Sequence, residues 1–348
     1  MEFSRESIFV SALRSFARMF FAVCGLFLAF VLCSIVYASL SSSSSIEEKT
    51  SINYLPDAAG KREVVSHTAP VVLQINIQGV IGEPKTLDTE VIQNILLDSR
   101  TGTLSADRVK AILLHLNTPG GTVVDSDNIY RLLLQYKERY KVPVFAYVSG
   151  MCASGGMYIA SAADQIFAGP ASIVGSVGVI LGPFFNVYDA MGKIGVQART
   201  LTQGLDKDMM NPTRPWREGE DASLKAVTAY FYQQFVNIVT SARPRLDKEK
   251  LVSEYGAQVF DPVEAERLGY IDFANASRDL ALLALLKEAH IDPSTPYQVI
   301  ELQSKNLWIS SLFKSTSPFF TGKIEHSIDL GGPKIRDKVA YLYQPGEN

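Results

Sequence analysis

The feature that most constrains the fold of this chain is an alternation of apolar strand-like segments with helix-like segments between residues 70 and 180. Strands that are apolar along their whole length are typical of parallel sheets, because both of their faces are buried. Such strands alternating with helices predict an α/β fold with right-handed crossover connections. The expected strands are 70–82, 109–117 and 142–148, and the helices between them are 89–101 and 126–140.

Further along, the sequence predicts a long helix at 220–243, a short helix and a strand within 259–274, and another helix at 277–291. Asp125 or Ser126 is the expected N-cap of helix 126–140, since short polar side chains accept hydrogen bonds from the first helical amides.

An uncharged run of residues, 19–38, precedes the α/β pattern. About 20 apolar residues suffice to span a bilayer. Arginines lie before the run, so the positive-inside rule predicts a cytoplasmic segment 1–18 and an outside location for residues 46–348. A cleaved signal peptide is the alternative, but its apolar core is typically shorter. We therefore expect a transmembrane anchor followed by a polar linker, 39–69.

The composition excludes several classes of protein. A net charge of −3 and the lack of basic stretches give no sign of nucleic-acid binding. Two of the three cysteines, Cys24 and Cys33, lie in the apolar run, so no disulfide framework is indicated. No Cys/His set has the spacing of a zinc site, and we expect neither a metal nor a cofactor.

Small residues crowd the stretch "SGMCASGGMYIASAADQIF" (149–167), where an apolar strand passes into a helix. A serine at such a point, Ser154, can expose its hydroxyl beside backbone amides, and Gly155 lets a substrate carbonyl approach them. Taken locally, Ser154 as a simple helix cap is the more ordinary interpretation. The turn "NTPGG" (117–121) ends another parallel-type strand, however, and open α/β folds place their sites at that edge.

A nucleophilic serine needs a base. The four histidines, His67, His115, His290 and His326, carry no motif. A lysine serves instead if burial keeps its amine neutral. Lys193 and Lys207 follow the serine, although either could be an ordinary surface lysine. Cys152 is a rival nucleophile with no evident base.

Four motifs in order, "NTPGG", "ASGGMYIASAAD", "GSVGV" and "KDMMNP", resemble the signal peptide peptidase A family of membrane-anchored Ser–Lys peptidases. The resemblance covers roughly residues 70–275, and the ordered set is more specific than any single motif. It implies a ClpP/crotonase-like fold of repeated ββα units, with a peptidase domain at 70–290 and a C-terminal extension at 291–348.

The resemblance also implies the roles of five residues. The nucleophile falls on Ser154, the general base on Lys207, and a serine that hydrogen-bonds the lysine amine on Ser176. The amides of Gly121 and Gly155 form the implied oxyanion hole.

The implied function is a serine endopeptidase of the short, single-domain form, in which one chain carries both Ser and Lys. It would be a single-pass protein of the bacterial inner membrane with an extracytoplasmic catalytic domain and contact with membrane lipid. It would form a homo-oligomeric ring, use no cofactor, and degrade signal-peptide remnants or other apolar peptides. One departure is Thr118, where the family usually has serine; the hydroxyl is kept. A crotonase-like acyl-CoA enzyme and a catalytically inactive membrane scaffold are the alternatives.

Overall fold

The computed structural model describes residues 8–41, 50–304 and 340–342. The chain divides into two units, Met1–Glu48 and Lys49–Asn348. In the first unit, helix α1 (Ile8–Ser41) contains a stretch, Leu13–Ser34, that is long and apolar enough to cross a membrane. The expected apolar span therefore lies within one continuous helix.

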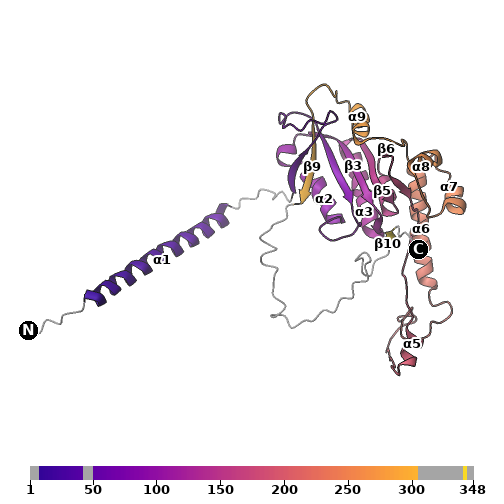
Figure 1. The fold of residues 1–348 in the computed structure, drawn as a ribbon, viewed down its shortest axis with the longest axis horizontal. Coiled ribbons are helices and arrows are strands. Elements are labelled where there is room, and N and C mark those ends of the chain that lie inside the picture. Colours follow the sequence, from indigo (N-terminus) through magenta and orange to yellow (C-terminus); the bar gives the residue numbers. More distant parts are fainter. Residues whose placement is uncertain (1–7, 42–49, 305–339, 343–348) are drawn as a thin grey trace, which may run out of the picture. The chain divides into compact units, whose positions relative to one another are not determined.

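The second unit is built on an eight-stranded sheet (Figure 1). The strand order is β1-β9-β2-β3-β5-β7-β8, and β6 pairs with the first part of β5. All pairings are parallel except those of β1 and β8. The strands are β1 (Thr50–Leu55), β2 (Val71–Gln78), β3 (Val109–Thr118), β5 (Val144–Ala153), β6 (Gln165–Ala168), β7 (Ile173–Gly175), β8 (Val259–Phe260) and β9 (Gln298–Ser304). The predicted α/β fold is confirmed.

Helices cover both faces of the sheet (Figure 1). Successive side chains of a strand point to opposite faces, so Val71 and Leu73 enter one core while Val72 enters the other. This explains why the strands are apolar along their length. The larger core includes side chains of α2 (Thr89–Asp98), α3 (Val123–Tyr140), α4 (Gly155–Ala160) and α6 (Ala222–Ala242). The smaller core is closed by α9 (Arg278–Glu288).

Short elements complete the second unit. A separate two-stranded antiparallel ladder joins β4 to β10. The short elements are η1 (Gly102–Leu104), β4 (Gly120–Thr122), α5 (Tyr188–Lys193), α7 (Lys248–Lys250), η2 (Leu251–Tyr255), α8 (Pro262–Leu268) and β10 (Ala340–Leu342).

Two segments expected outside the catalytic domain belong to its sheet. Residues 50–55, within the expected linker, form β1 and pair with β9, which lies within the expected C-terminal extension. The reason is a long-range contact: the backbone N and Oγ1 of Thr50 both donate to Oδ2 of buried Asp98, each at 2.9 Å. β9 in turn pairs with β2, so both additions extend one edge of the sheet.

The start of α3 also differs from the expectation. The turn "NTPGG" leads directly into β4, and the helix begins at Val123. Its N-cap is Thr122, whose side chain accepts from the amide of Asp125. Asp125 and Ser126 therefore lie in the first turn of the helix and do not cap it.

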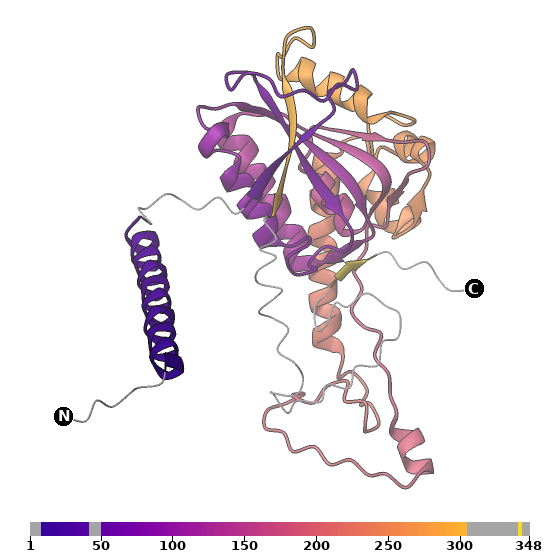
Figure 2. The same ribbon diagram turned by 60° about the vertical axis from the view of Figure 1, so that its left-hand side comes forward.

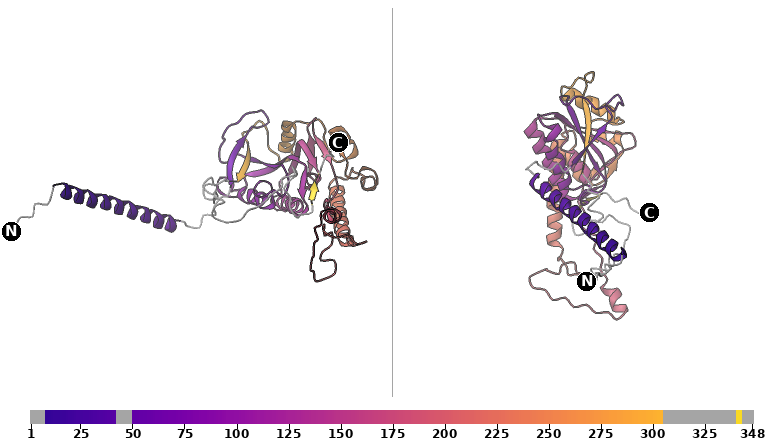
Figure 3. Two further views of the ribbon diagram at one scale, coloured as in Figure 1. Left: turned by 60° about the horizontal axis from the view of Figure 1, so that its bottom comes forward. Right: turned by 90° about the vertical axis from the view of Figure 1, so that its left-hand side faces the viewer.

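The segment between residues 181 and 219, here called the arm, leaves the sheet after β7 and returns at α6 (Figures 2 and 3). The structure describes the whole of the arm, which contains α5 and no strand. Large apolar side chains are exposed along it: Phe184, Phe185, Val187, Tyr188, Ile194, Val196, Leu201 and Leu205. Leu205 is 92% exposed. An apolar surface of this extent is typical of a protein interface.

Candidate active site

Ser154 lies at the junction of β5 and α4 in a backbone conformation that is unusual for a residue with a side chain. Its φ is 54° and its ψ is −116°. Positive φ is sterically unfavourable outside glycine and is often found at functional sites. Two hydrogen bonds hold it: the Ser154 N–H donates to the carbonyl of Gly175 at 2.9 Å, and its carbonyl accepts from Tyr158 at 3.1 Å. The surrounding sheet and helix therefore impose the conformation.

The Ser154 hydroxyl is buried without a hydrogen-bond partner among the described residues. The residue is 1% exposed, and Oγ contacts no donor or acceptor in that part of the chain. A buried polar group left without a partner costs about 1–3 kcal/mol, and such a group calls for a functional explanation. The unused hydrogen-bonding capacity of Oγ is available to a base and to a substrate.

Gly121 and Gly155 bring two backbone segments together beside Ser154. A Cβ atom on Gly155 would lie 3.3 Å from the backbone N of Gly121 and 2.5 Å from Oγ of Ser126. A Cβ atom on Gly121 would lie 1.9 Å from the carbonyl oxygen of Ile81. Neither position has room for a side chain, because Gly121 packs against the backbone of Ile81 and Gly155 packs against the side chain of Ser126.

Ser176 directly follows β7, the strand that lies beside the serine turn. β7 pairs with β5 through Ala153 and Gly175, so Ser154 and Ser176 follow directly after paired residues. Ser176 is buried, has a φ of 55°, and donates its N–H to the carbonyl of Gln258 at 2.7 Å. The structure thus brings four predicted site residues together: Ser154, Gly155, Gly121 and Ser176.

Lys207 is the one predicted site residue that the structure does not bring to Ser154. It is exposed and lies on the arm. Lys193, the other candidate, ends α5 on the same arm and is exposed. Among the described residues, neither hydrogen-bonds to the Ser154 hydroxyl.

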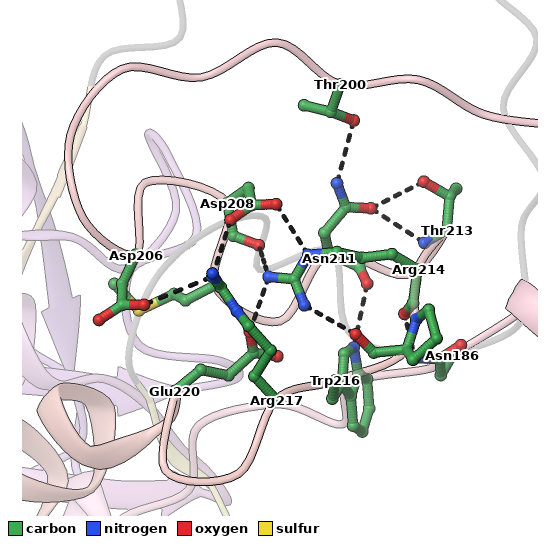
Figure 4. A network of polar contacts seen from close by, with 12 residues as sticks. Asn186, Thr200, Asp206, Asp208, Asn211, Thr213, Arg214, Trp216, Arg217 and Glu220 are labelled. Carbon is green, nitrogen blue, oxygen red and sulfur yellow. Dashed lines mark hydrogen bonds and ion pairs between the residues drawn. The ribbon is translucent and has the colours of Figure 1, made fainter.

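The turn that carries Lys207 is held by a network of ion pairs among arm residues and Glu220, which directly follows the arm (Figure 4). Arg214 contacts Asp208 at 2.7 Å and Glu220 at 2.6 Å. Arg217 adds contacts to Asp206 at 3.4 Å and to Asp208 at 3.1 Å. Hydrogen bonds from Arg214 hold the pKa of both Asp208 and Glu220 below the ordinary values.

This network was not foreseen from the sequence. The sequence pattern that indicates such a network is the alternation of acidic and basic residues in "DKDMMNPTRPWREGE" (206–220). The two aspartates that flank Lys207 are occupied by arginines, while Lys207 has no ion pair among the described residues.

The alternative catalytic groups are poorly placed. Cys152 is fully buried, and burial raises the pKa of its thiol to about 12. The His115 ring stacks on Tyr147 and has Nδ1 3.3 Å from Gln78, and burial lowers its pKa. His326 lies outside the described residues. Within the described part of the chain, no cluster of three His, Cys, Asp or Glu side chains could hold a metal ion.

An apolar groove begins directly after Ser176. Its volume is about 690 Å³, and it lies between the chain at 177–184 and the first half of α6. Its walls include Val177, Val179 and Tyr232. An extended peptide that passed the serine turn would find apolar surface beside it.

The fold is of the ClpP/crotonase-like α/β type and carries a buried serine on a strand–helix turn. The family model for peptidase family S49 matches residues 137–291, and the Clp protease model matches residues 85–174. By these matches the chain is similar to peptidase family S49 and to serine peptidases of the SppA type. A crotonase-like acyl-CoA activity is therefore not supported.

Relatives are found in bacteria and plants. A protein of Enterococcus faecium that carries the name of signal peptide peptidase SppA is 27% identical over 83% of this chain and 84% of its own length. Protease 4 of Salmonella typhi is 31% identical over 53% of this chain, but the match spans only 30% of that protein. The chloroplastic serine protease SPPA of Arabidopsis thaliana is 26% identical, over 65% of this chain and 33% of its own.

Among solved structures, a mutant of ClpP1 from Listeria monocytogenes aligns with a TM-score of 0.39 and 18% identity, covering 60% of this chain and 94% of that one. A mutant of the 1510-N membrane-bound stomatin-specific protease aligns with a TM-score of 0.39 and 19% identity, covering 68% of this chain and 98% of that one.

Proposed function

We propose that this protein is a membrane-anchored serine endopeptidase in which Ser154 is the nucleophile and Lys207 the general base. The observation that carries the proposal is the buried hydroxyl of Ser154, which has no hydrogen-bond partner among the described residues and is held at positive φ beside two glycine backbones. A neutral lysine amine takes the proton from Oγ, and Oγ attacks the carbonyl carbon of the scissile peptide. The lysine then protonates the leaving amine. Water activated by the same amine cleaves the acyl-enzyme ester and regenerates the serine.

The developing oxyanion would be bound by the amides of Gly121 and Gly155. A Cβ atom on Gly155 would lie 3.3 Å from the backbone N of Gly121, so the two glycine backbones lie close together. Each donor aimed at the oxyanion contributes about 3 kcal/mol to transition-state stabilisation. Ser176, on the neighbouring strand end, would orient the lysine amine.

We propose that Lys207 reaches Ser154 through assembly, with the arm of one copy entering the site of a neighbouring copy. The arm lies away from the sheet and exposes apolar side chains, and ion pairs among arm residues and Glu220 hold the Lys207 turn in shape. These are the properties of a segment that packs against a partner. In a closed ring of copies, every arm enters a neighbouring site and every Ser154 receives a Lys207. Such a ring is the kind of homo-oligomer expected from the sequence.

The proposed substrates are apolar peptides near a membrane, signal-peptide remnants among them. The apolar groove beside Ser176 favours such side chains. The antiparallel pairing of β10 with β4 supports a binding mode in which an extended peptide lies along Gly120–Thr122. The uncharged run 19–38 of helix α1 would anchor the protein, with the arginines before that run in the cytoplasm and the catalytic domain on the other side.

Active-site labelling tests this function. The full-length protein in detergent is treated with a fluorophosphonate probe, and the modified residue is mapped by mass spectrometry. We expect labelling at Ser154, hydrolysis of apolar peptides, and loss of both in Ser154→Ala. Lys207→Ala should also be inactive, because it removes the base. Lys207→Arg should be inactive as well, because a guanidinium stays protonated and cannot accept the serine proton. Activity that survives in Ser154→Ala or Lys207→Ala, with all variants folded, would contradict the assignment.

A further inference from the structure

We propose that Thr118 is a positioning residue for the peptidase reaction, because it joins the backbone that carries Ser154 to the strand that carries Gly121. The inference rests on the proposed function, in which the Gly121 amide binds the oxyanion. Thr118 ends β3 and is fully buried. Its two side-chain branches contact different parts of the site.

The hydroxyl branch holds β4. Oγ1 of Thr118 accepts a hydrogen bond from the Gly120 amide at 3.1 Å and donates to the carbonyl of Gly79 at 2.6 Å. Gly120 precedes Gly121 and has a φ of +103°, so its peptide group turns sharply here. The threonine hydroxyl therefore fixes the strand at the residue next to the oxyanion glycine.

The methyl branch packs against the serine turn. A Cβ atom on Gly156 would lie 2.7 Å from Cγ2 of Thr118. Thr118 also pairs with Cys152, two residues before Ser154, in the parallel ladder between β3 and β5. The same buried side chain thus contacts both segments that must be aligned.

Other contacts hold β4 from its far side. The Ile81 amide donates to the Gly120 carbonyl at 2.9 Å, and the Thr122 amide donates to the Ile81 carbonyl at 2.9 Å. On the side that faces the serine turn, the hydroxyl of Ser126 donates to the Thr122 carbonyl at 2.8 Å. These bonds hold the body of β4, whereas the Gly120 amide is held by Thr118. Loss of the hydroxyl therefore releases the end of β4 that enters the site.

Movement of this end of β4 would displace the Gly121 amide. The displacement would weaken transition-state stabilisation more than substrate binding, because the oxyanion forms only during the reaction. A misplacement of the order of 1 Å can lower the rate about 100-fold. A residue with this role should change kcat and the affinity for transition-state analogues together.

Three substitutions of Thr118 separate positioning from simple packing. Thr118→Val removes the hydroxyl and keeps the shape, Thr118→Ser keeps the hydroxyl and removes the methyl, and Thr118→Ala removes both. Thr240→Val is the matched control, since the Thr240 hydroxyl bonds only carbonyls of its own helix. The full-length proteins are assayed for kcat and KM on an apolar peptide, for inhibition by a peptide boronic acid, and for thermal unfolding.

For Thr118→Val we expect kcat to fall about 10- to 100-fold, with KM changed less than about twofold. Affinity for the boronic acid should fall by the same factor as kcat, because the boronate occupies the oxyanion hole. Thr118→Ser and Thr240→Val should stay near the wild type. If Thr118→Val does not fold, the comparison moves to Thr118→Ala, which must lose the activity that Thr118→Ser retains.

Wild-type kcat and boronic acid affinity in Thr118→Val would overturn the inference while leaving the proposed function intact. The same holds if Thr118→Ser loses as much activity as Thr118→Ala. A wild-type protein that hydrolyses peptides without labelling at Ser154 would instead overturn the proposed function, and with it this inference.

Discussion

At the scale of single residues, the site contains two potential nucleophiles two positions apart, and their surroundings separate them. Ser154 is held in a positive-φ turn with its hydroxyl unpartnered among the described residues. Cys152 lies within β5, fully buried, where only the neutral thiol is stable. The thiolate is the reactive form of cysteine, so the structure favours serine chemistry at this turn.

Cys152 should be inert to alkylation in the folded protein. Burial raises its pKa to about 12, so the thiol stays protonated at pH 8, below that value, whereas an unfolded cysteine is partly ionised there. In a Cys24→Ser/Cys33→Ser background, iodoacetamide should modify Cys152 only after denaturation, as read by mass spectrometry. Rapid modification of the native protein, together with loss of activity, would show that Cys152 is accessible and reactive.

At the scale of elements, the arm combines an exposed apolar surface with a rigid polar turn. Arg214 is the centre of that turn, because it contacts both Asp208 and the buried Glu220. Arg217 contacts the same acids from a more exposed position, with 54% of its side chain accessible. Substitution of Arg217 is therefore a suitable control for substitution of Arg214.

Arg214→Gln should reduce peptidase activity at least about tenfold, because the Lys207 turn loses its central contacts and the base is no longer presented in one geometry. The α/β unit should keep its unfolding temperature, since the arm lies apart from both cores. Arg217→Gln, the matched control, should have a smaller effect because exposed ion pairs contribute little. Equal activity in wild type and Arg214→Gln would show that the turn does not depend on this network.

The pairing of β10 with β4 has a consequence for substrate binding, because Tyr341 lies opposite Gly121. A substrate that uses the same edge must displace β10. Tyr341→Pro, which removes a strand amide, should therefore raise initial rates at low peptide concentration. If the lost pairing contributes about 1 kcal/mol, the initial rate at low peptide concentration should rise about fivefold. An unchanged rate would indicate that β10 and substrate do not compete; Tyr341→Phe serves as the control.

Much of the fold could be predicted from local patterns, and what could not depends on long-range contacts. The apolar runs predicted β2, β3 and β5, and the glycines around Ser154 predicted a close-packed turn. β1 was not predicted, because its place depends on Asp98 and β9, which are far away in the sequence. The hydroxyl of Thr118 was noted, but its partner Gly79 directly follows another strand, β2. No local pattern contains that contact.

At the scale of the whole molecule, the separation of Lys207 from Ser154 yields a direct test of assembly. Ser154→Ala and Lys207→Ala should each be inactive alone. If each arm serves a neighbouring copy, mixing the two variants before assembly should restore about a quarter of the wild-type activity, since half of the sites keep the serine and half of those receive an intact lysine. Activity is read on an apolar peptide, with oligomer size measured by light scattering. No recovery in properly mixed assemblies would place both groups of a site in one copy.

The arm also affects when the enzyme can act. Under the proposed assembly, a newly made copy carries every reactive group and still has no working centre, because its base lies on a segment that reaches outward. Peptides near a solitary copy would thereby be left intact. Under that proposal, hydrolysis would begin only where copies have accumulated and enclosed their serines together, so the abundance of the protein would set the onset of proteolysis.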